Sequence, residues 1–407
     1  MKRTFLCLIL LFVFSGCTII KLKKDLAEMD KTALIGGRVE SESSDTHPIF
    51  IGIFRDNHTS KILFDKTVFA GPSLFAFLVP HGEYDLVSFQ DLNGNSAYDM
   101  GEPATVKRVI KTDSKRERFT LSLDTQFKPT QDQLDEFKNA RKEIQNALPI
   151  SFGDIADLDD DIFSVDFGLK GFWEPLSFLK LAGTGIFFME EYSPDKIPVL
   201  FVNGAASSPL SWKMLMENID KEKFQAWFFL YPSGLRIDKS AGGLAEVLQE
   251  VHNIYGFKKM VLIAHSMGGL VTYRGIQLLC NNKAYGDYEN LFISISTPWN
   301  GHNLAASGVK RSPAVVPCWI DMDPASDFIK KLFESDVPCA HHLLFSYAGS
   351  SITIKGNSDG SVSLSSMLRN EAQNKAKQVF GFNETHVSIL ESKEVLKHLN
   401  RIMEQYY

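Results

Sequence analysis

The chain has 407 residues, which is enough for two or three domains. Hydrophobic residues make up 44% of it and charged residues 23%, the balance of folded protein rather than of a disordered chain. A formal net charge of -6, with no basic stripe in the sequence, argues against nucleic acid as a partner, and five cysteines are too few for a disulfide scaffold.

The first residues have the pattern of a secretion signal. Lys2 and Arg3 precede an apolar run over residues 4–14, which is too short to span a bilayer. The run ends at F-S-G-C, with small residues directly before Cys17, and this resembles a bacterial lipoprotein signal. The resemblance implies a signal peptide over 1–16, a palmitate-type lipid anchor on Cys17 and a place in the cell envelope, in the outer membrane if the source is Gram-negative. An ordinary cleaved secretory peptide and an uncleaved anchor are the alternatives.

A polar segment and a β-rich region follow. Residues 17–31 contain several lysines, and we expect them to form a tether. From 32 to 125, short β-type runs such as P-I-F-I-G-I-F and L-F-A-F-L-V alternate with turn residues and predict a small β-sandwich. The phrase V-P-H-G-E-Y-D-L-V-S-F-Q-D-L-N-G-N in this region resembles transthyretin-like and carboxypeptidase-regulatory accessory domains. The resemblance implies an all-β accessory domain.

One loop of this region carries oxygen-bearing side chains at the spacing of an EF-hand loop. These side chains belong to Asp91, Asn93, Asn95, Asp99 and Glu102. Oxygen ligands of this kind suit calcium better than zinc, so the spacing predicts a structural calcium site. The sixth position is a serine rather than glycine, and no flanking helices are apparent, so a hydrogen-bonded Asx-type turn is the alternative.

Residues 126–192 are expected to connect the accessory domain with the next one. Thr130 and Gln133 form a capping-box pattern, and apolar residues follow at helical spacing up to Leu148, which predicts a linker helix. The remainder of the segment is acidic and aromatic by turns. We interpret it as a packing segment without a chemical role.

Apolar strands alternate with helical stretches from Ile197 onward, which predicts parallel β-α units in a domain over 193–407. The predicted strands are 197–202, 225–231, 259–264, 291–296, 343–347 and 377–381, and helices are expected at 240–254 and 268–281. The strands are continuously apolar, as parallel strands buried on both faces are.

The run K-K-M-V-L-I-A-H-S-M-G-G-L-V carries the candidate nucleophile. A predicted strand ends at Ala264, Ser266 follows in a sharp turn, and Gly268 opens a helix, which is the setting of a nucleophile elbow. The strained turn needs small residues two positions before and after the serine, and Ala264 and Gly268 meet this need. The following helix directs its positive end at the hydroxyl. A glycine-rich turn with an incidental serine is the alternative.

A serine hydroxyl needs a base, and in this fold an acid and then a histidine follow the serine along the chain. His386 follows the last predicted strand in F-N-E-T-H-V-S-I-L and is the candidate base. Asp359, in D-G-S-V, is the candidate acid that orients the imidazole, with a plain Asp-Gly turn as the alternative. Weaker candidates are His302, His341, His342, His398, Asp321, Asp323, Asp327 and Asp336.

Backbone N–H groups are expected to form the oxyanion hole. One donor is expected from Met267, directly after the nucleophile. The other is expected from Ala205, in the loop N-G-A-A-S-S-P, which resembles the H-G-x segment of lipases. Asn203 stands where that family often has histidine, but a backbone donor tolerates the exchange. A plain strand–turn is the alternative.

Residues 197–400 together resemble α/β-hydrolases of the lipase and esterase group, in the branch described as PGAP1-like, and Y-P-S-G-L and S-T-P-W-N-G-H add to the resemblance. It implies an α/β-hydrolase fold, with a mostly parallel sheet and helices on both faces. It also implies hydrolysis of a carboxylic ester, of an acyl lipid, through an acyl-enzyme on Ser266 without a catalytic cofactor. Acyl transfer, amide hydrolysis and phospholipase action on the same triad are alternatives, as is a non-catalytic surface-binding lipoprotein. The expected partners are the ester or lipid substrate and the membrane, and no protein partner is indicated.

Residues 302–340 form an insertion in this domain. Apolar side chains such as Trp319 suit either a lid over the site or a packed loop, and both interpretations stay open. Cys318 and Cys339 within the insertion are candidates for a disulfide in an oxidising compartment.

Overall fold

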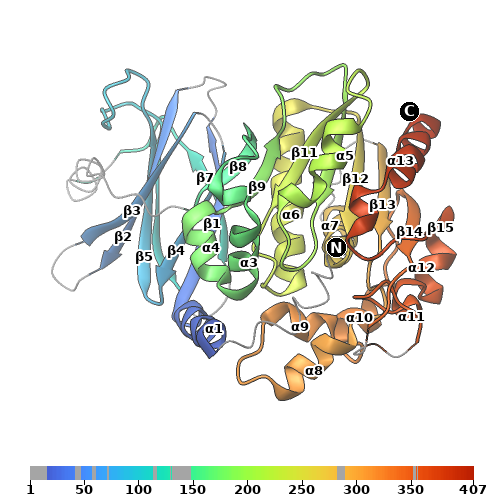
Figure 1. Ribbon diagram of the computed structural model, residues 1–407. Coiled ribbons are helices and arrows are strands. Elements are labelled where there is room, and N and C mark those ends of the chain that lie inside the picture. Colours follow the sequence, from blue (N-terminus) through green and yellow to red (C-terminus); the bar gives the residue numbers. More distant parts are fainter. Residues whose placement is uncertain are drawn as a thin grey trace. The chain divides into compact units, whose positions relative to one another are not determined.

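The computed structural model describes the chain as two compact units (Figure 1). One unit comprises Leu26–Ile150 and Lys180–Ala182, and the other comprises Met1–Asp25, Ser151–Leu179 and Gly183–Tyr407. We refer to them as the accessory unit and the catalytic unit. The described residues are 16–41, 47–56, 61–70, 73–112, 117–128, 130, 148–281, 289–351, 354 and 356–407.

The accessory unit is all-β, as expected from its alternating short runs. One sheet has the order β4-β1-β7, with β4 antiparallel and β7 parallel to β1. The other has the order β3-β2-β5-β6 and is antiparallel throughout. The strands are β1 (Thr32–Ser41), β2 (Pro48–Asp56), β3 (Lys61–Ala70), β4 (Ser73–Pro80), β5 (Glu83–Gln90), β6 (Ala104–Lys111) and β7 (Glu117–Leu123). Alternate residues of both sheets, among them Ile35, Ile51 and Phe77, form a shared apolar core.

The segment expected to be a tether is helical. Helix α1 spans Gly16–Met29. Leu22 and Asp25 are buried, three residues apart on one face of the helix, while Lys23 and Lys24 are exposed. The lysines hid this helical periodicity in the sequence. In the described part of the chain, no helix combines the length and the apolar character needed to cross a bilayer.

The catalytic unit is built on an eight-stranded sheet with the order β15-β14-β13-β12-β10-β11-β9-β8. Strands β10 to β15 are parallel, and β9 is antiparallel to β11. The strands are β8 (Ile150–Ile155), β9 (Thr184–Phe188), β10 (Ile197–Val202), β11 (Phe224–Leu230), β12 (Lys259–His265), β13 (Glu289–Ile295), β14 (Ala340–Ser346) and β15 (Gln378–Phe382). All six predicted strands are present, and the chain has the expected α/β-hydrolase fold.

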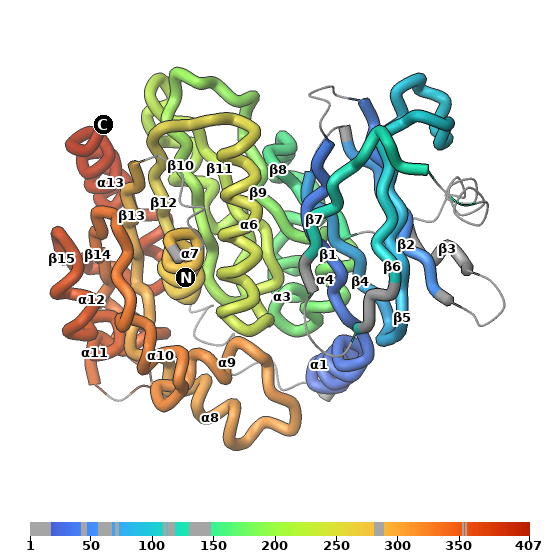
Figure 2. Tube along the Cα trace, turned by 180° about the vertical axis from the view of Figure 1, so that it is seen from behind, coloured from blue at the N-terminus to red at the C-terminus, as the bar shows by residue number. Residues whose placement is uncertain are grey.

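Helices flank this sheet, and Figure 2 shows α6 and α7 in front of it. The helical elements are η1 (Asp161–Phe163), α3 (Val165–Trp173), α4 (Pro175–Ala182), η2 (Pro209–Trp212), α5 (Lys213–Asn218), α6 (Ile237–Tyr255), α7 (Met267–Asn281), α8 (Asn303–Arg311), α9 (Pro317–Met322), α10 (Asp327–Lys331), α11 (Leu364–Met367), α12 (Asn370–Lys375), η3 (Ser388–Glu391) and α13 (Lys393–Tyr406).

The start of the catalytic sheet differs from the sequence expectation. Residues 150–192, interpreted as a packing segment, supply β8 and β9 at one edge of the sheet together with α3 and α4. Their strands are short and aromatic, and β9 packs Phe188 on Trp227 of β11 with ring centroids 4.0 Å apart. The linker helix expected after Thr130 falls almost entirely on 131–147, which lie outside the described residues.

Candidate active site

Ser266 lies in the turn between β12 and α7. Its φ of 53° is in the left-handed region, which is strained for a residue with a side chain and typical of a nucleophile elbow. A Cβ atom on Gly268 would lie 2.5 Å from the carbonyl oxygens of Val202 and Asn203. The small residue two positions after the nucleophile is therefore required by the close approach of the end of β10.

The structure brings together the three residues that the sequence predicts as nucleophile, base and acid. Nε2 of His386 lies 3.0 Å from Oγ of Ser266, and Nδ1 of His386 lies 2.6 Å from Oδ2 of Asp359. The three residues follow β12, β14 and β15, at the carboxyl ends of these parallel strands. In this geometry the hydroxyl donates to Nε2 while Nδ1–H donates to the carboxylate, as general-base activation requires.

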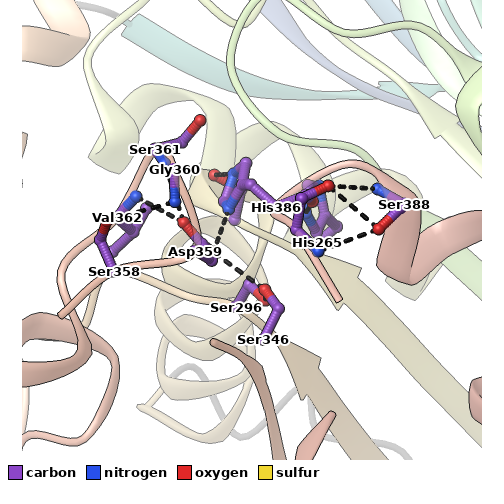
Figure 3. A network of polar contacts seen from close by, with 12 residues as sticks. His265, Ser296, Ser346, Ser358, Asp359, Gly360, Ser361, Val362, His386 and Ser388 are labelled. Atoms are coloured by element: carbon purple, nitrogen blue, oxygen red, sulfur yellow. Dashed lines mark hydrogen bonds and ion pairs between the residues drawn. The ribbon is translucent and has the colours of Figure 1, made fainter. Parts of the chain in front are cut away.

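Asp359 is buried and surrounded by donors, as Figure 3 shows. Its Oδ1 accepts the backbone N–H groups of Ser361 and Val362 at 2.9 and 2.7 Å. Its Oδ2 accepts the hydroxyl of Ser346 at 3.0 Å in addition to His386. Burial alone would raise the pKa of Asp359, but attraction to His386, the hydrogen bond from it and the two N–H groups together lower it. The acid is therefore held as a carboxylate.

His265, which is not among the residues predicted from the sequence, supports the loop that carries the base. Its Nε2–H donates to the backbone carbonyl of His386 over 2.8 Å, and the two rings lie 4.5 Å apart. Burial, followed by repulsion from His386, lowers the pKa of His265 to about 3, so the ring stays neutral. The feature of the sequence that indicates this role is a histidine directly before the nucleophile, at the end of β12.

His302 is a second histidine near the site. Its Nε2 lies 2.6 Å from the carbonyl oxygen of Ser361, beside the acid, and its Nδ1 accepts the N–H of Leu304 and caps α8. Burial lowers the pKa of His302. The insertion that starts here is thereby attached to the acid loop.

The segments that carry the two predicted oxyanion-hole donors lie beside the nucleophile. A Cβ atom on Gly204 would lie 2.9 Å from Cβ of Ser266, so the loop after β10 passes directly beside it. Met267 is the first residue of α7, where an N–H has no acceptor within the helix. Among the residues that the structure describes, the N–H of Ala205 has no hydrogen bond. Both groups are thus available to a developing oxyanion.

The loop that carries Ala205 is held by its neighbours. Nδ2 of Asn203 donates to the carbonyl of Ser207 over 2.9 Å, and Ala206 donates its N–H to Oγ of Ser233 over 3.0 Å. The hydroxyl of Tyr231 donates to the carbonyl of Asn203 over 2.7 Å. Asn203 therefore shapes the loop, a role that the sequence left in doubt.

A buried aspartate joins the insertion over 302–340 to the start of α6. Asp321, one of the weaker acid candidates, accepts Nε and Nη2 of Arg236 at 2.9 and 2.6 Å and the N–H of Ile237 at 2.6 Å. Asp321 is almost completely buried in α9, and its partners stand at the start of α6. In this conformation α9 is fastened to the catalytic unit, and Asp321 takes no part in the triad.

The structure does not form the predicted disulfide, because Cys318 and Cys339 are both free thiols. Cys318 is buried in the first turn of α9, where its N–H donates to the carbonyl of Gly234. Cys339 precedes β14, and burial followed by the nearby Cys280 raises the pKa of its thiol to about 12. The two residues therefore have different surroundings despite their proximity in sequence.

The loop from Asp91 to Glu102 uses its oxygens internally. Asp91 accepts the N–H groups of Gly94, Asn95 and Ser96, and Glu102 accepts those of Leu92 and Asp99. The side-chain nitrogens of Asn93 and Asn95 both point at Asp99. In the described residues no three His, Cys, Asp or Glu side chains are grouped as a metal site. The arrangement is that of an Asx-type turn; calcium binding stays a prediction.

Comparison with known proteins agrees with this fold. Residues 234–406, which include Ser266, Asp359 and His386, match the family model "Alpha/beta hydrolase of unknown function (DUF915)". No curated protein matches the sequence significantly.

Several solved structures are similar at low identity. The mature form of the Bacillus licheniformis lipase BlEst2 is 18% identical, with a TM-score of 0.43 over 54% of this chain and 97% of that chain. Lipase B of Aspergillus fumigatus is 17% identical, with a TM-score of 0.37 over 50% and 52% of the two chains. Phospholipase PlaB of Legionella pneumophila, in complex with thio-NAD, is 17% identical, with a TM-score of 0.36 over 42% and 44% of the two chains. This chain thus spans about half the length of the last two.

Proposed function

We propose that this chain, whose catalytic unit has the α/β-hydrolase fold, hydrolyses carboxylic esters of acyl lipids through an acyl-enzyme on Ser266. The observation that carries the proposal is the unbroken hydrogen-bonded series from the hydroxyl of Ser266 through His386 to Asp359. A serine in a strained elbow, a base within hydrogen-bond reach and a buried carboxylate are the three parts that nucleophilic acyl transfer needs.

The geometry supports a two-step reaction. Nε2 of His386 accepts the proton of Ser266 as Oγ attacks the ester carbonyl, and Asp359 stabilises the imidazolium. The N–H groups of Ala205 and Met267 bind the oxyanion of the tetrahedral intermediate. His386 then gives its proton to the departing alcohol oxygen, which leaves the acyl group on Ser266. Water, deprotonated by His386, attacks the acyl carbon and releases the acid and the free serine.

We also propose that the protein is anchored in a membrane of the cell envelope by a lipid on Cys17. The proposal rests on the apolar run and the small residues before this cysteine. A lipid anchor keeps the enzyme at the surface where acyl lipids are concentrated, and stable anchoring needs two or more hydrocarbon signals. An acyl lipid in or near the bilayer is therefore the substrate class we propose.

An activity-based probe tests the proposal directly. A fluorophosphonate should label the purified protein, and p-nitrophenyl esters of graded length should be hydrolysed with a preference that reports the acyl chain. Ser266→Ala should abolish labelling and lower turnover by about 10⁴-fold or more. Ser365→Ala, which removes an exposed serine near the acid loop, is the matched control and should keep both. An unlabelled, inactive wild-type protein would leave the non-catalytic alternative.

A further inference from the structure

Helix α1 is fixed to the catalytic unit by a buried carboxylate in its third turn. Asp25 is only 3% exposed, and Leu22, one turn earlier on the same face, is fully buried. Oδ2 of Asp25 accepts the N–H of Leu176 at 2.8 Å. Its Oδ1 accepts the N–H and the hydroxyl of Ser177 at 2.9 and 2.6 Å. Within the described parts of the chain, the polar contacts of this carboxylate are all made with the first turn of α4.

These contacts supply acceptors for N–H groups at the start of α4 that have no acceptor within the helix. The residue at its own N-cap, Glu174, makes no side-chain hydrogen bond to the helix, so the first N–H groups of α4 depend on another acceptor. Asp25 supplies that acceptor from a segment about 150 residues away along the chain. Its negative charge also suits the positive end of the helix, and Lys21 pairs with Glu174 at 3.6 Å. The attachment of α1 is thus specific rather than incidental.

The attachment point adjoins the active site through α3, which ends directly before α4. A Cβ atom on Gly168 of α3 would lie 2.5 Å from the carbonyl oxygen of Ser207, in the loop that carries Ala205. At the end of α3, the ring of Trp173 stacks edge-on against Trp319 of α9 with centroids 5.9 Å apart. Helix α3 therefore connects the attachment point of α1 with the loop that carries Ala205 and with the insertion over 302–340.

The arrangement of the helices in the catalytic unit agrees with this connection from α1 through α3 to the active site. In Figures 1 and 2, α1 lies at the same end as α8 and α9. Helix α8 begins at His302, which contacts the acid loop at Ser361. The proposed lipid site at Cys17 lies two turns before Asp25, about 12 Å along the helix axis. The lipid and the active site thus belong to one end of the unit.

The outward side of α1 suits a bilayer surface. Ile20 is 66% exposed, and Lys23 and Lys24 are also exposed, while Leu22 and Asp25 face inward. An apolar side chain and lysines close to a lipid anchor add attraction to the interface and to anionic headgroups.

We propose that α1 is a rigid mount rather than a tether, and that it holds the active-site end of the catalytic unit against the membrane carrying the Cys17 lipid. The substrate is then an ester presented by that same bilayer surface. This inference rests on the proposed function. A flexible tether of 15 residues would wander over roughly 20 Å with no fixed orientation, whereas a docked helix sets both distance and direction.

The experiment compares one enzyme on two substrates. Lipidated full-length protein is reconstituted in phosphatidylcholine vesicles, and hydrolysis of soluble p-nitrophenyl butyrate is measured beside that of a fluorogenic diacylglycerol in the same vesicles. Asp25→Ala should hydrolyse the soluble ester within twofold of wild type and the vesicle ester at least tenfold more slowly. Asp30→Ala removes an exposed carboxylate just beyond the end of α1 and should match wild type on both.

A second variant avoids disturbing α1. About twelve glycine and serine residues inserted between Cys17 and Thr18 lengthen the connection to the lipid while leaving the Asp25 contacts intact. This variant should show the same selective loss on the vesicle ester. Wild-type rates on that ester for both variants would overturn the mount, as would a wild-type protein active only on the soluble ester. Failure of wild type on both substrates would instead reject the proposed function.

Discussion

The ring of His265 donates a hydrogen bond from Nε2 to the backbone carbonyl of His386, 2.8 Å away. Because His265 directly precedes Ser266, one residue of the nucleophile strand positions the loop that carries the base. A neutral His265 is required, since a second positive charge beside the imidazolium of His386 would oppose proton transfer. The lowered pKa of His265, caused first by burial, meets this requirement.

The acid assignment predicts different effects for two buried aspartates. Asp359→Asn should lower esterase turnover by about 10³–10⁴-fold with little change in melting, because an amide cannot stabilise the charged imidazole. His386→Ala should cost a similar factor, and neither loss should add to that of Ser266→Ala, since the three act as a unit.

Asp321→Asn provides the contrast. It leaves the triad intact but weakens the contacts with Arg236 and Ile237, so we expect a loss of roughly 1–3 kcal/mol in unfolding free energy with turnover within a few fold. Steady-state kinetics and chemical denaturation of both variants separate the roles. A silent Asp359→Asn together with an inactive, stable Asp321→Asn would show that the acid is misassigned.

Lipidation at Cys17 predicts a labelling result. Metabolic labelling with palmitate should tag the wild-type chain, and Cys17→Ser should remove the label, because acylation requires the thiol. Cys7→Ser, within the predicted signal peptide, is the matched control and should leave labelling intact. Thr18 follows the cysteine where inner-membrane retention usually has aspartate, so the labelled protein should fractionate with the outer membrane in a Gram-negative host. Label retained by Cys17→Ser would place the lipid elsewhere.

The calcium prediction for the Asp91–Glu102 loop is tested by melting the full chain. To bind calcium, Asn93 and Asn95 would have to turn their oxygens, rather than their nitrogens, toward Asp99. A ligand that binds only the folded state stabilises it by about 2.7 kcal/mol at a hundredfold excess over Kd. Calcium should then raise the melting temperature of the accessory unit relative to chelator, and not in Asp91→Ala. Superimposable curves for wild type would leave the hydrogen-bonded turn as the full account.

Two buried histidines predict that stability falls in acid. Burial lowers the pKa of His341, and of His265, to about 3 from an ordinary 6.5. Between these values the unfolded chain binds more protons than the folded one. The contribution of these histidines to the free energy of unfolding is therefore fully present above pH 6.5 and is lost as the pH falls toward 3. Each histidine contributes at most about 1.4 kcal/mol per pH unit.

His341 offers the cleaner variant, because it lies away from the triad, with Nε2 2.8 Å from Oγ of Ser294. His341→Gln keeps a hydrogen-bonding group there but cannot titrate. Denaturation at several pH values between 7.5 and 4.5 should give a shallower slope for the variant than for wild type. Parallel profiles would mean that His341 does not contribute to the acid sensitivity.

The sequence predicted the parts of the fold that have a strong local pattern. Strands β10 to β15 are continuous apolar runs, and the elbow around Ser266 combines a strand end with glycines, so both were recognisable. The meeting of His386 and Asp359 with Ser266 followed from the fixed chain order of this fold. In contrast, β8, β9 and the docking of α1 depend on contacts between distant segments, such as Asp25 with Ser177, which no local pattern contains.

The role of His265 was missed, and the role of the Asn203 side chain was left open, for a related reason. The side chains of His265 and Asn203 donate hydrogen bonds to backbone carbonyls. Every residue type has a backbone carbonyl, so the amino-acid sequence does not reveal which residue accepts such a bond. The disulfide was misjudged because two cysteines in one insertion suggested proximity, whereas the fold directs Cys318 into the unit and Cys339 toward Cys280.

The position of β8 and β9 at the edge of the catalytic sheet has a consequence for recombinant fragments. A fragment cut at residue 193, the domain boundary predicted from the sequence, would lack both strands and leave one edge of β11 without hydrogen-bonding partners. Such an open, aromatic edge pairs readily with other copies, so the shortened protein should be recovered as aggregate rather than as a working hydrolase. Expression of the hydrolase portion alone should therefore begin no later than Ile150.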